Sequence, residues 1–171
     1  STNIVLRVFG FNPNESDETV TEEEILMMVD AGTEKNQFDA SAKDMIANIF
    51  EFDDTTAGEI MTHRTEVCAG EDTTSIGEVV QLAQEKGYSR IPVYHEDIDS
   101  IVGVVYAKDL LRFVGKPVAE EIRVTDVMRS AYYVPETKRC YDLFKEMTER
   151  KVQFAVIIDE YGGTEGIITM E

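Results

Sequence analysis

Two charged residues, Arg90 and Asp109, have a type and a position that suit a polar ligand. Arg90 directly precedes the apolar run I-P-V-Y, so a strand there would carry its guanidinium to the edge of a cleft, where it could bind phosphate. Asp109 lies near the expected start of a helix, and one carboxylate can accept hydrogen bonds from both hydroxyls of a ribose. Simpler interpretations stay open: Arg90 as a surface ion-pair former, and Asp109 as a charge that stabilises a helix N-terminus.

The other reactive residues give little support for catalysis or for a metal site. Cys68 and Cys140 are the only cysteines, which is too few for a disulfide framework and is typical of a reducing compartment. His63 and His95 lie far apart in the sequence, without partners at ligand spacing, so no zinc site is predicted. No G-x-S-x-G motif is present. We therefore expect a protein that is not an enzyme in its own right.

The charge balance excludes some partners. The 171 residues include 34 acidic and 16 basic ones, which gives a formal net charge of −18. Such a surface repels nucleic-acid phosphates, so nucleic acid is not an expected partner, and an anionic ligand needs a local group of basic residues. Simple solubility explains most of the charge. No apolar run approaches the ~18 residues that cross a bilayer, and the first and last residues suggest an excerpt from a longer protein.

The elements that must position these residues begin after a short apolar strip and a polar loop, residues 1–19. Thr21 to Glu24 form a T-x-x-E capping box, which predicts the start of a helix. Gly32 is the expected end of this helix. A second helix is predicted from about Ser41, because apolar residues follow at helical spacing. Residues 20–54 therefore form a small helical segment that precedes the rest of the chain.

From residue 55 onward the sequence repeats itself. Met61 is matched by Met128 at an offset of 67, and Gly103 is matched by Gly166 at an offset of 63. Between them, Y-S-R-I-P-V-Y is matched by V-Q-F-A-V-I-I at an offset of 64. Short loop deletions would produce this shrinking offset. The pattern predicts two copies of one structural unit.

Each copy has the same internal order. In the first, Ser75 to Glu78 form a capping box, and the helix that it opens is closed by Gly87; strands at 91–94 and 101–106 follow. In the second, a helix from Cys140 precedes strands at 154–158 and 166–169, joined by a hairpin turn at Gly162-Gly163. The unit is β-α-β-β-α, led by a short extended segment. Because units of roughly 60 residues are weakly stable alone, the two should pack sheet to sheet.

The strand endings G-V-V-Y-A-K-D and G-I-I-T-M-E resemble the mark of the cystathionine-β-synthase (CBS) domain, whose tandem pair is called a Bateman module. The stretches F-D-D-T-T-A-G-E-I-M-T-H-R, G-Y-S-R-I-P-V-Y, V-M-R-S-A-Y-Y-V-P-E and D-E-Y-G-G-T-E-G-I-I-T are similar to the hemolysin-C/CorC-like proteins, relatives of the cyclin-M magnesium transporters. The resemblance covers nearly the whole chain from about residue 20. It implies an α/β (α+β) fold of two tandem CBS units with pseudo-two-fold symmetry. The expected boundaries are a juxtamembrane remnant at 1–19, the helical preface at 20–54, unit 1 at 55–115 and a C-terminally truncated unit 2 at 116–171.

The resemblance also implies a function: the cytoplasmic regulatory part of a plasma (inner) membrane protein that transports or exports magnesium or cobalt. Modules of this kind bind an adenine nucleotide, AMP or ATP, the latter with magnesium, in the cleft between the units. The implied partners are a second copy, paired through the helix faces at 75–87 and 138–151, and the transmembrane domain of the parent chain. Two alternatives stay open: a dimerising scaffold without a ligand, and the regulatory domain of a metabolic enzyme.

Carried over residue by residue, the resemblance places the nucleotide against Thr65, Ser89, Arg90, Ile91, Pro92 and Thr169. The pair Ile91-Pro92, beside Val67, would give adenine an apolar edge. The ribose aspartate of the second motif would be the residue after Glu171. The second cleft would use Tyr106 and Asp109, although Tyr106 stands where a small hydroxyl residue is usual.

Overall fold

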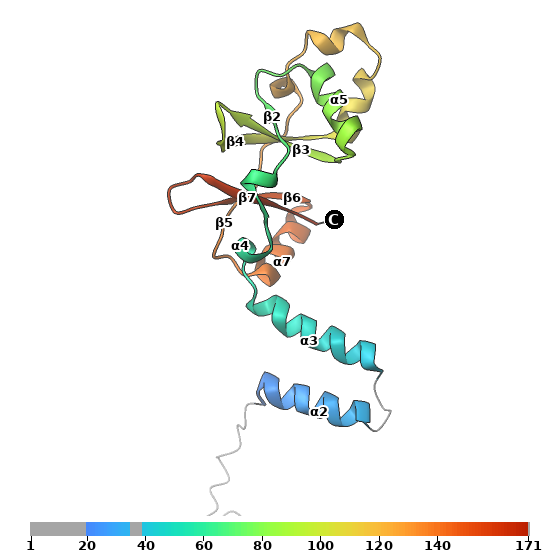
Figure 1. Cartoon of the computed structure of the whole chain (residues 1–171), viewed down its shortest axis with the longest axis vertical. Helices are drawn as coiled ribbons and strands as arrows, with labels where there is room; N and C mark the ends of the chain where they lie inside the picture. The colour runs from blue at the N-terminus through green and yellow to red at the C-terminus, as the bar shows by residue number, and fades with distance from the viewer. Residues whose placement is uncertain (1–19, 35–38, 171) are drawn as a thin grey trace, which may run out of the picture. The chain divides into compact units, whose positions relative to one another are not determined.

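The computed structural model describes residues 20–34 and 39–170 (Figure 1). The chain divides between Glu51 and Phe52 into two compact units. The apolar strip and polar loop expected at residues 1–19 lie outside the described residues.

The first unit holds helix α2 (Glu22–Glu34) and most of helix α3 (Ala40–Asp54). The predicted capping box is confirmed: Thr21 Oγ1 accepts from the Glu24 amide (3.2 Å), and the Glu24 carboxylate accepts from the Thr21 amide (3.1 Å). The expected end at Gly32 is wrong, because the helix continues to Glu34 and Gly32 is buried inside it. Lys43 and Asp30 form an ion pair at 2.5 Å that joins the two helices.

The second unit holds the two repeats. After helix α4 (Ala57–Ile60), the first repeat comprises β1 (Thr62–His63), η1 (Arg64–Glu66), β2 (Gly70–Glu71), α5 (Ile76–Lys86), β3 (Arg90–His95), β4 (Asp97–Tyr106), α6 (Ala107–Leu110) and η2 (Leu111–Phe113). After η3 (Pro117–Glu120) and η4 (Val124–Asp126), the second comprises β5 (Tyr133–Pro135), α7 (Cys140–Arg150), β6 (Phe154–Ile158) and β7 (Thr164–Thr169). The predicted mixed α/β fold is confirmed.

Local sequence explains the two main helices. Ser75 and Glu78 form the expected capping box, and Gly87 ends α5 in the left-handed conformation at φ 72°. This conformation carries little strain for glycine. In α7, the buried residues Cys140, Leu143 and Met147 recur at helical spacing. Phe144, the neighbour of Leu143 in the sequence, is half exposed.

Each repeat contributes a sheet in which a short first strand, β2 or β5, pairs parallel with the first strand of a hairpin. The first sheet has the order β2-β3-β4, and the second has the order β1-β7-β6-β5. Both sheets contain an antiparallel hairpin, formed by β3 and β4 in the first and by β6 and β7 in the second. The first hairpin differs from the expected strands at 91–94 and 101–106, because β4 already begins at Asp97. Only Glu96, with φ 63°, separates it from β3.

The two repeats exchange the chain segments that lead into them. Strand β1 belongs to the first repeat by sequence, but Thr62 pairs with Ile167 on β7 of the second. Reciprocally, Arg129 precedes the second repeat and forms a bridge with Val104 on β4 of the first. The reciprocal exchange relates the repeats by the expected pseudo-two-fold symmetry.

The exchange explains the repeated methionine and glycine. A Cβ built on Gly166 would lie 2.4 Å from the Thr62 carbonyl oxygen and 2.8 Å from the Met61 sulfur. A Cβ built on Gly103 would lie 2.7 Å from the Met128 sulfur. Each lead-in therefore crosses the strand of the other repeat at a point where only glycine leaves room.

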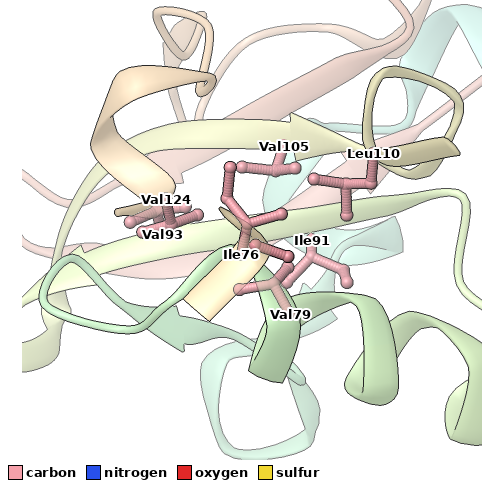
Figure 2. Packing of buried hydrophobic residues seen from close by; sticks show 8 residues of the cluster. Ile76, Val79, Ile91, Val93, Val105, Leu110 and Val124 are labelled. Carbon is pink, nitrogen blue, oxygen red and sulfur yellow. The ribbon is translucent and has the colours of Figure 1, made fainter. Parts of the chain in front are cut away.

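Three groups of buried residues stabilise the second unit. In the first repeat, Ile76 and Val79 of α5 pack against Ile91 and Val105 of the sheet (Figure 2). A matching cluster joins α7 to β6 in the second repeat. A third cluster includes Val104 and Val156, one from each sheet, and Figure 1 shows the sheets stacked on each other. The expected sheet-to-sheet packing is thus present.

Candidate functional site

The main candidate site is a cavity of about 360 Å³ between the two repeats. The lining residues come from the first lead-in, from the end of α5 with the start of β3, and from β7: Thr62, Glu66, Val67, Cys68, Gly87, Tyr88, Ser89, Arg90, Pro92, Ile167 and Thr169. The cavity thus depends on the exchange of lead-ins, because the pairing of β1 with β7 brings Thr62 beside Ile167.

Arg90 is the only basic residue of this lining. It is half-buried at the start of β3, and its Nη2 donates to Oε1 of Gln153 in the second repeat. Its guanidinium carbon lies 5.7 Å from the centre of the Tyr106 ring. The Arg90 guanidinium therefore lies between the two repeats.

Four of the six residues expected in the first cleft line the cavity: Ser89, Arg90, Pro92 and Thr169. The side chain of Ile91 is fully buried in the core of the first repeat (Figure 2). Thr65 is not in the cavity lining; its hydroxyl lies 3.1 Å from Nδ1 of His63.

Several lining residues were not expected. Gly87 and Tyr88 directly precede Ser89, so the motif G-Y-S-R could have indicated them. Thr62 and Ile167 reach the cavity through the strand exchange, which has no local signal in the sequence. Cys68 lies near Val67, which was expected to contact the base.

The chemistry of the lining is mixed. The hydroxyls of Thr62, Ser89 and Thr169 can donate to and accept from a sugar. Val67 and Pro92 offer apolar surface to a flat ring, and Arg90 can pair with an anion. This combination suits a ligand with an apolar ring, several hydroxyls and a negative charge.

The residues expected in the second cleft are held by a neighbouring cation. Both Nε and Nη2 of Arg129 donate to one oxygen of Asp109, at 3.0 and 2.7 Å. The same guanidinium lies over the Tyr106 ring, 4.6 Å from its centre. The carboxylate expected to bind a ribose is thus already engaged by Arg129.

Strand register gives the equivalent positions of the two clefts. Thr62 pairs with Ile167 on β7, and Arg129 pairs with Val104 on β4, so Thr62 and Arg129 occupy equivalent positions. In the first hairpin Arg90 pairs with Tyr106, and in the second Phe154 pairs with Thr169. Tyr106 and Thr169 are therefore equivalent. The second cleft therefore has an arginine and a tyrosine where the first has two threonines.

A second hollow of about 360 Å³ lies beside Asp109, lined by Lys108, Asp109, Arg112, Asp126 and Val127. Four of these five side chains are charged, so the hollow offers little apolar surface to a base. It differs in this respect from the cavity that Arg90 lines.

Neither a membrane helix nor a metal centre accompanies these cavities in the described part of the chain. None of the helices in residues 20–34 and 39–170 combines the length and the apolar character that crossing a bilayer requires. The same ranges contain no group of three or more histidine, cysteine, aspartate or glutamate residues able to hold a metal ion. Burial, together with the charge of Glu59, raises the pKa of the Cys140 thiol above its ordinary value.

Comparison with known proteins identifies the family of this chain. The family model described as "CBS domain" matches residues 57–116 and 124–171. Among curated proteins, the magnesium and cobalt efflux protein CorC of Salmonella typhimurium is 32% identical over 149 residues, which are 87% of this chain and 51% of CorC. The chain spans between 25% and 51% of the length of the first curated relatives that it matches.

Two solved structures are similar over most of the chain. The CBS domain of a bacterial CNNM/CorC family Mg²⁺ transporter is 38% identical to this chain, with a TM-score of 0.82. The similarity covers 88% of this chain and 92% of the solved chain. A structure of such a domain in complex with ATP is 41% identical to this chain, with a TM-score of 0.74. That similarity covers 77% of this chain and 92% of the solved chain.

Proposed function

Because the chain belongs to the CBS domain family, in the branch of the CNNM/CorC magnesium transporters, we propose that it is the adenine-nucleotide-binding regulatory part of a membrane cation transporter. Magnesium or cobalt is the proposed cargo, since the relative CorC is named as their efflux protein. The module itself carries out no reaction. It lies on the cytoplasmic side of the plasma (inner) membrane, where nucleotide is available.

The observation that carries the proposal is the composition of the cavity between β1, β3 and β7. Adenine fits against Val67 and Pro92, and the ribose hydroxyls fit among the hydroxyls of Ser89 and Thr169. Arg90 binds the phosphate, since it is the only cation of the lining. A solved relative described in complex with ATP supports this choice of ligand.

The ligand is AMP or ATP, and magnesium accompanies the triphosphate. A chain of net charge −18 disfavours a highly charged anion. A bound divalent cation cancels part of the negative charge of ATP and so lowers this repulsion. Glu66, in the lining of the cavity, is another reason why a bare triphosphate is disfavoured.

The proposed partners are a second copy of the chain and the transmembrane domain of the same protein. Tyr141 and Phe144 on α7 are 51% and 50% exposed. Apolar side chains on the outer face of α7 can be covered in a homodimer with isologous contacts. Light scattering should give twice the chain mass; a monomer at high micromolar concentration would refute the dimer.

Calorimetric titration with AMP and with ATP plus magnesium tests the nucleotide proposal. Arg90→Ala should weaken binding about tenfold to hundredfold, because it removes a charge-assisted hydrogen bond worth about 1.5–3 kcal/mol. Arg112→Ala removes a cation whose guanidinium lies over Phe113, and it should leave the affinity unchanged. If neither nucleotide binds the wild type, the module is better described as a scaffold.

A further inference from the structure

An apolar cavity shares a wall with the cavity proposed to bind the nucleotide. It has a volume of about 150 Å³, and its lining includes Phe52 from the last turn of α3 and Phe144 from α7. Ile168 and Met170, at the end of β7, line it as well, and Thr169 between them lines both cavities. We call the apolar cavity the Phe52 pocket and the other one the nucleotide cavity.

The end of β7 separates the two cavities. Successive side chains of a strand point to opposite faces of the sheet, and accordingly Ile167 lines the nucleotide cavity whereas Ile168 lines the Phe52 pocket. Thr169 and Met170 are exposed at the end of the strand, and the ends of elements open at the lowest free energy. A ligand that orders this strand end from one face therefore also orders the side chains on the other face.

A polar connection leads to the same strand end. Nη2 of Arg90 donates to Oε1 of Gln153, and the backbone carbonyl of Gln153 accepts from the Met170 amide at 3.2 Å. Gln153 thus holds the cation of the nucleotide cavity and a residue of the Phe52 pocket at once. A phosphate that immobilises Arg90 therefore also limits the motion of Gln153 and of the end of β7.

On its other side, the Phe52 pocket is bounded by the junction of α3 with α7. The rings of Phe52 and Phe144 are arranged edge to face, with an angle of 80° between their planes and 6.3 Å between their centroids. Beside them, the Cys140 amide donates to the Thr55 carbonyl oxygen at 2.8 Å. Helix α3 begins in the first unit and ends in the second, which starts at Phe52. The last turn of α3 therefore contacts the second repeat through the Phe52 pocket.

We propose that the contact between Phe52 and Phe144 couples the nucleotide cavity to the last turn of α3, so that nucleotide binding orders this turn and the contact in return strengthens nucleotide binding. This inference rests on the proposed nucleotide site. Phe52 acts as a positioning residue, because it does not line the nucleotide cavity and reaches it only through the end of β7. The two effects are equal in size, since the coupling free energy between two sites is reciprocal.

The alternative is that the two rings serve stability alone. Phe52→Ala would then lower the free energy of unfolding and leave the nucleotide affinity of the folded protein unchanged. The affinity therefore separates the two explanations.

Calorimetric titration with ATP and magnesium, under conditions where every variant is fully folded, tests the coupling. Phe52→Ala and Phe144→Ala should each weaken binding about twofold to tenfold, the scale of one aromatic pair. The double variant should bind no more weakly than the single ones, because the contact is already lost in each of them. Tyr161→Ala is the matched control: it removes a 95% exposed ring from the turn between β6 and β7 and should leave the affinity unchanged.

Hydrogen exchange measures the same coupling from the other side. Saturating ATP with magnesium should slow the exchange of the amides at 52–54 about twofold to tenfold in the wild type and leave it unchanged in Phe144→Ala. The amides at 159–163, in the turn of the same hairpin, should exchange at the same rate with and without nucleotide.

Three outcomes would overturn the inference and leave the nucleotide proposal intact. They are an unchanged affinity in both phenylalanine variants, losses that add in the double variant, and unchanged exchange at 52–54 in a wild type that binds nucleotide. If the wild type binds no nucleotide, both proposals are wrong.

Discussion

Where the first cleft has Thr62 beside β7, the second has Arg129 beside β4, and where the first has Thr169, the second has Tyr106. The threonines border an open cavity, whereas the arginine and the tyrosine lie against each other. The backbone of the two repeats is nevertheless paired in the same way around both positions. Different side chains at equivalent positions therefore give one symmetric fold two different surfaces.

The comparison separates the residues that maintain the fold from those that distinguish the clefts. Gly103 and Gly166 occupy equivalent crossing points, and each accepts the methionine of the opposite lead-in. These positions repeat because both repeats need the same close approach. The residues that line the clefts do not repeat, because Thr62 and Thr169 of the first cleft correspond to Arg129 and Tyr106 of the second.

The largest expected effect concerns these glycines. Gly166→Ala and Gly103→Ala should each destabilise the fold by about 2–3 kcal/mol, because the added methyl group overpacks a strand crossing. Gly166→Ala should cost more, since its Cβ would meet a backbone oxygen at 2.4 Å. Urea denaturation of both variants measures this. A loss confined to one of the two would show that the lead-ins are not exchanged symmetrically.

The next effect concerns the start of the two main helices. Ser75 caps α5 in a full capping box, whereas Arg139 precedes α7 without a side-chain cap. Ser75→Ala should cost about 1 kcal/mol in the free energy of unfolding. Arg139→Ala should stay within about 0.5 kcal/mol, as is usual for an exposed side chain. Equal losses in the two variants would contradict this difference between the helices.

The smallest effect concerns a titratable pair that only the first repeat has. A hydrogen bond from Nδ1 of His95 to Asp72 (2.7 Å), together with the charge of Asp72, raises the pKa of His95 above its ordinary value. Since the folded-state pKa is raised, the pair stabilises the fold fully below about pH 6.5, and this contribution is lost as the pH rises through the folded-state pKa. The effect is small because the imidazole is exposed.

An NMR titration of the histidine ring protons checks this prediction. In Asp72→Asn, the pKa of His95 should fall towards its ordinary value. At the equivalent position of the second repeat, Asp159 accepts from the amides of Tyr161 and Gly163 instead. An unchanged pKa of His95 in Asp72→Asn would show that the pair makes no contribution.

Much of the fold could be predicted because its signals are local. Ser75 and Glu78 encode a helix start within four residues, and the repeat offset reveals the duplication. The partner of β1 could not be predicted, because Thr62 and Ile167 lie far apart in the sequence and β1 is only two residues long. Such a short strand carries no periodic pattern of its own.

The candidate site was predictable where it follows strand geometry. Alternation along β3 puts Arg90 and Pro92 on one face and Ile91 on the other. The strand pattern itself could therefore have assigned Ile91 to the core rather than to the cleft. The engagement of Asp109 by Arg129 depends on how the lead-in folds back onto β4, which the sequence does not reveal.

The number of nucleotides bound per chain tests the account most directly. Equilibrium dialysis with labelled ATP and magnesium, at saturating nucleotide, should give one nucleotide per chain. Arg90→Ala should lose that binding at concentrations near the wild-type Kd, whereas Asp109→Asn should retain it. Two nucleotides per chain in the wild type would contradict the account, because the second cleft would then accept a nucleotide despite Arg129 and Tyr106.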